Sequence, residues 1–205
     1  MSWIDRCFRA VVVGILAALL LVAGCATTTP QPEPTSPEAA AAPKQAAEAE
    51  KRARLETQFE KAVALQREGQ FEQAAMLYRQ IHEEAPDLAA PLANLGIIAF
   101  KKGDEAQARE LFQQVIERDP HHPAALNHLG MMARRDGDFE QAETYYRQAL
   151  ETHPDYAPAI RNLAILLDLF QGRFDEALPL YEKYQSLQDE PDPKVKEWIF
   201  DLKHR

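Results

Sequence analysis

The chain repeats itself with a period of 34 residues, and this recurrence restricts the fold more than any other feature of the sequence. The recurring positions are a glycine, a small residue, an aromatic residue and a proline: Gly69, Gly103 and Gly137; Ala74, Ala108 and Ala142; Tyr78, Phe112 and Tyr146; Pro86, Pro120 and Pro154. In a fourth copy, Gly172, Ala177 and Tyr181 each follow their counterparts by 35 residues, which places one inserted residue between Leu163 and Gly172. Such a period is typical of stacked structural units.

Each unit has the pattern of two helices joined by a turn. In the second unit, the first helical stripe comprises Leu92, Leu95, Gly96 and Ala99, and Lys102-Gly103-Asp104 ends it. The second stripe comprises Ala108, Leu111, Phe112 and Val115, and it ends before Pro120 because the residue preceding a proline avoids the helical region. Gly96 and Ala108 are small where the two helices approach closely, so that Phe112 fits beside them. Enlarging Ala108 is expected to overpack this contact by about 1–3 kcal/mol.

This pattern resembles the tetratricopeptide repeat family, whose motif is met in the third unit by Leu126, Leu129, Gly130, Ala133, Ala142, Tyr146 and Pro154. The resemblance implies an all-α superhelix of four helix-turn-helix repeats, at residues 55–88, 89–122, 123–156 and 157–192. Short helices are marginal alone, so neighbouring units must stabilise one another. We expect a helical extension over 44–54 and a capping helix over 193–205, whose apolar stripe is Val195, Trp198, Ile199 and Leu202.

Residues 1–24 have the features of a signal peptide, because two arginines precede an apolar run from Ala10 to Ala23. As a helix this run would span about 21 Å, less than the roughly 30 Å of a bilayer core. Residues 21–25, LVAGC, resemble the lipobox of bacterial lipoproteins, which implies cleavage before Cys25 and lipidation of Cys25. Because Ala26 rather than Asp follows, the resemblance implies an outer-membrane anchor facing the periplasm. The alternative is ordinary cleavage that leaves Cys25 unmodified.

Residues 25–43 combine the lipidated cysteine with a segment that contains five prolines and no large apolar residue. Such a segment cannot bury a core, so we expect it to be a disordered tether between the membrane and the repeats.

Charge and composition exclude several functional classes. With 32 acidic and 23 basic residues the net charge is −9, the wrong sign for a protein that neutralises nucleic-acid phosphates. Both cysteines, Cys7 and Cys25, precede the repeats, which therefore hold no disulfide and no thiolate. His121 and His122 are adjacent but have no assignable third metal ligand, and no nucleophile elbow or phosphate-binding glycine loop occurs. We therefore expect no metal, no cofactor and no catalysis.

A curved stack of helix pairs leaves a concave face lined mainly by the first helix of each pair. On that face we predict an apolar row of Ile97, Met131 and Ile165. Polar and basic residues border the row: Asn94, Lys101, Asn127, His128, Arg135, Arg161 and Asn162. Such a lining suits an extended peptide or a partner helix with acidic groups. The alternative is that neighbouring helices or the tether cover the row.

Together these features predict a non-catalytic adaptor that is monomeric without its protein partner and is anchored at the periplasmic face of the outer membrane. Similar small lipoproteins assist the assembly of type IV or tight-adherence pili and their secretins, so an envelope complex of that kind is the first expectation. One alternative is an accessory subunit of a Ton/Tol-type energy-transducing complex or of a peptidoglycan-synthesis machine. The others are a structural homo-oligomer and an enzyme that acts on the envelope.

Overall fold

The computed structural model describes residues 37–204, with side chains from residue 43 onward, and this part of the chain contains helices and turns but no strand. The predicted signal peptide, Cys25 and residues 26–36 lie outside the described residues. The chain divides into two units, Met1–Gln45 and Ala46–Arg205, and the packing described below belongs to the second unit.

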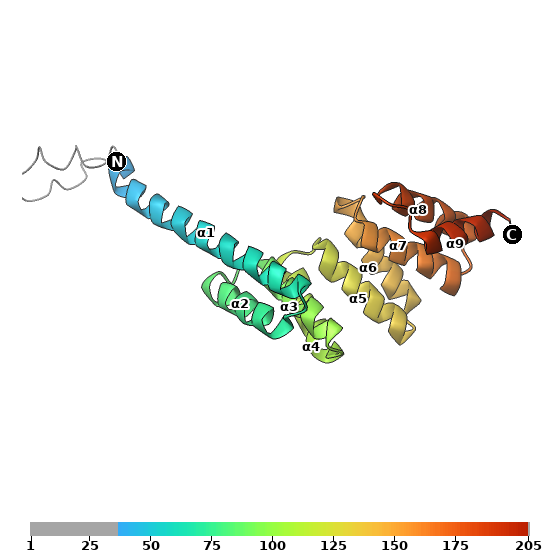
Figure 1. Cartoon of the computed structure of the whole chain (residues 1–205), viewed down its shortest axis with the longest axis horizontal. Coiled ribbons are helices and arrows are strands. Elements are labelled where there is room, and N and C mark those ends of the chain that lie inside the picture. The colour runs from blue at the N-terminus through green and yellow to red at the C-terminus, as the bar shows by residue number, and fades with distance from the viewer. Residues whose placement is uncertain (1–36, 205) are drawn as a thin grey trace, which may run out of the picture. The chain divides into compact units, whose positions relative to one another are not determined.

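Four helical hairpins follow one another along the chain (Figure 1). They are α1 (Pro37–Arg67) with α2 (Phe71–Glu84), α3 (Ala89–Lys101) with α4 (Glu105–Arg118), α5 (Pro123–Asp136) with α6 (Phe139–Thr152), and α7 (Ala157–Ile165), continued by the π-helix η2 (Leu166–Phe170), with α8 (Phe174–Ser186). A last helix, α9 (Pro193–Lys203), packs against α8. From α2 onward each helix contacts the next, and α5 also contacts α3 and α7. The expected all-α superhelix of stacked hairpins is confirmed.

The turns explain why glycine recurs at the period of the repeat. The glycine between the two helices of each hairpin has a positive φ of 65–85°, a conformation that other residues rarely adopt: Gly69, Gly103, Gly137 and Gly172. In the two middle hairpins an aspartate follows this glycine and caps the second helix. Asp104 accepts a hydrogen bond from the backbone N–H of Gln107 at 3.1 Å, and Asp138 accepts one from that of Gln141 at 3.0 Å.

A contact between a glycine and an aromatic ring holds each middle hairpin together. A Cβ atom built on Gly96 would lie 2.7 Å from Cε1 of Phe112, and one built on Gly130 would lie 2.6 Å from Cε1 of Tyr146. Both rings are fully buried. Gly96 therefore leaves room for the ring of Phe112, as predicted.

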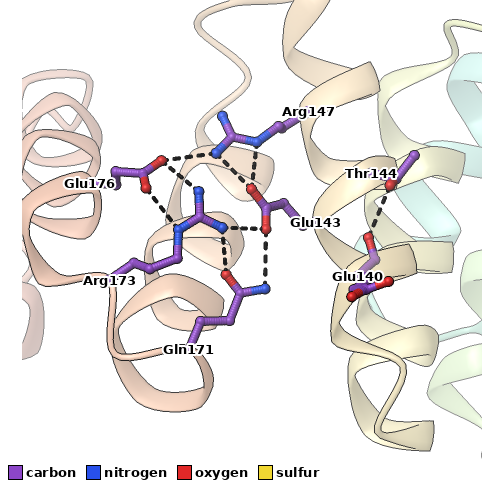
Figure 2. Close-up of polar contacts among 7 residues, drawn as sticks. All are labelled: Glu140, Glu143, Thr144, Arg147, Gln171, Arg173 and Glu176. Carbon is purple, nitrogen blue, oxygen red and sulfur yellow. Dashed lines mark hydrogen bonds and ion pairs between the residues drawn. The ribbon is translucent and has the colours of Figure 1, made fainter.

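Ion pairs cross from each hairpin to the next, and the densest group joins α6 to α8 and the turn before it (Figure 2). Glu143 accepts hydrogen bonds from Arg147 at 2.7 Å, from Arg173 at 2.7 Å and from Gln171 at 3.1 Å. Arg173 also binds Glu176 at 2.7 Å. Individual surface pairs contribute at most about 1 kcal/mol, so we regard this network as a local brace between repeats rather than the source of the fold.

The inserted residue of the fourth repeat is accommodated in the π-helix. In the first three hairpins, a backbone hydrogen bond closes the turn across five residues, as from Asp104 N–H to Ala99 O at 3.0 Å and from Asp138 N–H to Ala133 O at 2.9 Å. The equivalent bond in the fourth hairpin, from Arg173 N–H to Leu167 O at 2.8 Å, spans six residues. The extra residue therefore lies between Leu167 and Arg173, within the predicted interval.

One boundary was predicted incorrectly. The expected tether reached Pro43, but α1 begins at Pro37 and includes both residues 37–43 and the predicted extension over 44–54. Proline is well tolerated at the first helical position, and the four alanines that precede Pro43 are the strongest helix formers. Proline inside a helix, here Pro43, costs about 3 kcal/mol. We attribute the continuity of α1 to the proline at its start and to the four alanines, which offset this cost.

The capping helix α9 lies where the apolar stripe predicted it. Val195 is fully buried, and Trp198, Ile199 and Leu202 are partly buried against the core of the last two repeats. Among the described helices, none combines the length and the apolar character that crossing a bilayer requires.

Replacing Gly96 with Ala is expected to lower the free energy of unfolding by about 1–3 kcal/mol, because the added methyl group overlaps the ring of Phe112. In an unobstructed helix the same change is stabilising by roughly 0.5–1 kcal/mol, so the sign of the effect is diagnostic. Urea denaturation followed by circular dichroism measures it. Combining Gly96→Ala with Phe112→Leu should cost less than the sum of the two single changes; an additive loss would refute this explanation.

Candidate protein-binding surface

The ten residues predicted to bind a partner all lie on the first helices of repeats two to four. Asn94, Ile97 and Lys101 belong to α3; Asn127, His128, Met131 and Arg135 belong to α5; Arg161, Asn162 and Ile165 belong to α7. Because α5 contacts both α3 and α7, these residues lie on three adjacent helices. We call this set the first-helix face.

The apolar row on this face is half-buried. Ile97 packs against the core cluster of the first three repeats, and Met131 and Ile165 pack against that of the last two. Neither group of contacts covers them fully, and none of the three is as exposed as the large apolar side chains at the surface. The neighbouring helices therefore cover the row in part and leave part of each side chain accessible.

The two amides at the centre of the face pair with each other. Nδ2 of Asn162 donates to Oδ1 of Asn127 at 2.8 Å, and the two residues are only 9% and 4% exposed. A buried hydrogen bond of this kind contributes about 1 kcal/mol, and an unpaired buried amide costs about 1–3 kcal/mol. This pair therefore links repeats three and four. Asn94 instead donates to the carbonyl of Ala90 in its own helix, at 3.0 Å.

His128 packs between repeats two and three. Its ring stacks on that of Phe112, with centroids 4.8 Å apart and 7° between the planes, and it meets the edge of Phe100 at 5.1 Å. Burial, and secondarily the charge of Lys101, lower the pKa of His128 to about 4, so the ring is neutral near pH 7. Its main role in this structure is packing, which the sequence pattern alone did not reveal.

The three cations of the face lie over aromatic rings. Nζ of Lys101 is 5.5 Å from the centroid of Phe71, and Cζ of Arg135 is 5.4 Å from that of Phe100. Arg135 also pairs with Glu105 at 2.5 Å. Cation–π contacts at exposed sites contribute about 0.5–1 kcal/mol, and they fix the position of the charge more than they neutralise it.

Arg161 is held by the C-terminal helix. Its Cζ lies 5.6 Å from the centroid of Trp198, and its Nε lies 3.9 Å from Oδ2 of Asp192. Because α9 contributes the ring and the turn before it contributes the carboxylate, the capping helix sets the position of this arginine.

The predicted face omits α9, although the residue spacing indicates that this helix continues the series of first helices. Trp198 follows Leu163 by 35 residues, and Phe200 follows Ile165 by 35 residues, so α9 occupies the register of a fifth first helix. Phe200 is 61% exposed and lines a shallow hollow with Pro193, Lys196, Glu197 and Asp201. By this spacing, Phe200 occupies in α9 the position that Ile97, Met131 and Ile165 occupy in the three preceding first helices.

The described residues give no sign of a metal centre, because no group of three or more His, Cys, Asp or Glu side chains there is arranged to hold an ion. His121 is exposed, whereas His122 caps α5 by accepting a hydrogen bond from Ala125 N–H at 3.4 Å. Burial lowers the pKa of His122.

Family models described as tetratricopeptide repeat match residues 56–87, 93–157 and 133–197. No match was found among curated proteins. Among solved structures, the chain is similar to PilF of Pseudomonas aeruginosa, with 20% identity, coverage of 73% of this chain and 68% of that chain, and a TM-score of 0.63.

Two further structures have the same fold. A thermophilic tetratricopeptide repeat protein of Thermus thermophilus is 21% identical, with coverage of 72% and 80% and a TM-score of 0.59. An O-GlcNAc transferase of Thermobaculum terrenum is 24% identical with a TM-score of 0.58; the match covers 65% of this chain and 27% of that one. At these identities the likeness establishes the fold alone.

The stability of the protein is expected to fall between about pH 6.5 and pH 4 partly because of His128. The folded state resists protonation of this ring until about pH 4, whereas the unfolded state takes up the proton near pH 6.5, so acid favours unfolding. Replacing His128 with Phe keeps an aromatic ring and should reduce the loss of unfolding free energy over this interval by about 1–3 kcal/mol. Urea titrations at several pH values test this. His121→Gln is the control; an unchanged pH slope in His128→Phe would contradict the prediction.

Proposed function

The chain belongs to the tetratricopeptide repeat family, a scaffold for protein–protein interaction, and from this premise we propose that its first-helix face binds a protein or peptide partner. The observation that carries the proposal is the arrangement of α3, α5 and α7 side by side, with a half-buried apolar row bordered by cations that aromatic rings hold in place. Apolar side chains of a partner would contact the row. Acidic groups would bind Lys101, and they would compete with Glu105 for Arg135 and with Asp192 for Arg161.

The protein acts as an adaptor and not as an enzyme. Among the described residues, the buried amides of Asn127 and Asn162 pair with each other, and no group of three or more His, Cys, Asp or Glu side chains is arranged to hold a metal ion. The face offers binding groups without the convergent acid and base chemistry that a reaction requires.

We place this adaptor at the periplasmic face of the outer membrane, anchored through a lipid on Cys25, in the assembly of a type IV or tight-adherence pilus and its secretin. The likeness of residues 21–25 to a lipobox supports the anchor, and the fold shared with PilF supports the choice of process. An energy-transducing complex or a peptidoglycan-synthesis machine remains the alternative that the experiments below distinguish.

Replacing Met131 and Ile165 with Asp is expected to reduce partner capture at least tenfold, because two charges would face the partner's apolar side chains. A photo-crosslinking amino acid at Lys101 in intact cells, followed by mass spectrometry, measures capture and identifies the partner. Secretin or pilin peptides support the proposed process, and motor or peptidoglycan-synthesis proteins support the alternative.

The control replaces Met76 and Leu88 with Asp, since these exposed apolar residues lie outside the first-helix face. Circular dichroism verifies that both double variants fold. If the Met131 and Ile165 variant does not fold, Lys101→Glu at an exposed position replaces it and should weaken crosslinking to an acidic partner from a probe at Asn94. Undiminished capture by a folded variant would refute the proposed surface.

Replacing Cys25 with Ser is expected to move the protein from the outer-membrane fraction to the soluble fraction, because the acyl chains would be lost. Metabolic labelling with radioactive palmitate measures the modification directly. Cys7→Ser is the matched control, since Cys7 lies within the predicted signal peptide and should leave labelling intact. Labelling that survives in Cys25→Ser would rule out this anchor.

A further inference from the structure

The turn of the fourth repeat exposes apolar side chains where the other repeats carry charge. The two residues before the turn glycine are Arg67 and Glu68, Lys101 and Lys102, and Arg135 and Asp136 in the first three repeats. In the fourth repeat the two residues before Gly172 are Phe170 and Gln171, because of the inserted residue. Leu169 and Phe170, which lie 34 residues after Arg135 and Asp136, are 59% and 45% exposed. Since the equivalent turns of three repeats carry charged residues, stacking of the repeats does not require apolar side chains here.

Two neighbouring aromatic residues, the half-buried Phe139 and the exposed Phe174, extend this surface. The ring centroids of Phe139 and Phe170 are 5.0 Å apart, and Cζ of Arg134 lies 5.6 Å from the centroid of Phe170. Phe174 begins α8 and is 40% exposed. We call Phe139, Leu169, Phe170 and Phe174 the turn patch.

The ion-pair network joins the two segments that carry the ends of the patch. Glu143 lies one helical turn after Phe139 and binds Arg173, the residue before Phe174, at 2.7 Å (Figure 2). Contiguous exposed apolar groups of this kind on a soluble domain usually mark an interaction site, and π-helical insertions are frequent at such sites.

The exposed charge that borders the patch is negative. Asp138 and Glu140 flank Phe139, Asp175 follows Phe174, and all three are exposed. Within residues 43–204 no ion pair involves these three carboxylates. The nearest arginines of the network, Arg147 and Arg173, are paired with Glu143 and Glu176. Arg134 also lies over the patch, against Phe170, but it is half-buried, so the exposed charge is that of the three carboxylates.

This charge selects among the molecules that could cover the patch. A second copy of the chain, docked symmetrically, would bring the same carboxylates face to face. An anionic lipid surface would be repelled by them. A protein segment with apolar side chains and flanking lysine or arginine complements both the rings and the carboxylates.

We propose that the turn patch is a second docking surface, separate from the first-helix face, that binds an apolar segment of another protein flanked by basic residues. Its residues lie at the end of η2 and at the starts of α6 and α8. The protein thereby presents two surfaces of opposite charge preference, because the first-helix face suits acidic groups and the turn patch suits basic ones.

The test uses two synthetic 14-residue amphipathic helices with identical leucine positions, one with lysine and one with glutamate at the other positions, and isothermal titration with the mature chain. The patch variant combines Leu169→Arg with Phe170→Asp, which leaves the net charge unchanged and introduces the residue types found 34 residues earlier, at Arg135 and Asp136. The matched control combines Met76→Arg with Leu88→Asp at exposed apolar sites elsewhere.

We expect the lysine helix to bind the natural chain and the control at least tenfold more tightly than the patch variant. It should also bind at least tenfold more tightly than the glutamate helix. Glu140→Gln with Asp175→Asn should weaken binding of the lysine helix severalfold. If the patch variant does not fold, Leu169→Gln alone replaces it, since that side chain is the most exposed of the four.

Equal affinity of the natural chain and the folded patch variant for the lysine helix would overturn the proposal. So would a dimer in sedimentation, or binding to phosphatidylglycerol vesicles, that the patch substitutions abolish, because either result would identify a different occupant. Combining Met131→Asp with Ile165→Asp, which disrupts the first-helix face, should leave the affinity for the lysine helix unchanged. The proposals for the two surfaces can therefore be refuted independently.

Discussion

The close approach of an aromatic ring to a small residue of the partner helix, a glycine in the two middle hairpins, is the contact on which the stacked hairpins depend. Phe112 lies against Gly96 and Tyr146 lies against Gly130 at distances that leave no room for a side chain. In the fourth repeat Ala164 takes the place of glycine, and Tyr181 remains fully buried with its hydroxyl 3.3 Å from Asp168. Each ring fixes the spacing of its two helices and so determines which residues remain for contact with the next hairpin.

Much of the fold follows from the sequence because the constraints are local and repeated. A turn glycine, a small residue and an aromatic residue at fixed spacing define a hairpin, and only stacking buries its apolar side. The site of the insertion could be predicted for the same reason, since Gly172 and Tyr181 shift together relative to Leu163. The start of α1 could not be predicted, because a proline is equally compatible with an extended chain and with the first turn of a helix.

The candidate site was only partly accessible to the same reasoning. Spacing places residues on a helix face, but it does not reveal which neighbour each side chain meets. His128 stacks on Phe112 of the preceding repeat, and Asn127 pairs with Asn162 of the following one. The equivalence of Phe200 to Ile165 could be predicted from the spacing of 35 residues. It was missed because the residues that lie beside Phe200 on α9, such as Lys196 and Glu197, are polar.

The π-helix has a consequence for how such a chain can change during evolution. Because each hairpin contacts mainly its neighbours, one extra residue at the end of a first helix disturbs a single turn, and the hydrogen bond from Arg173 to Leu167 closes it again. In a fold with many long-range contacts, the same insertion would shift the register of elements far away. A linear array can therefore acquire new surface chemistry one turn at a time while its remaining units keep their geometry.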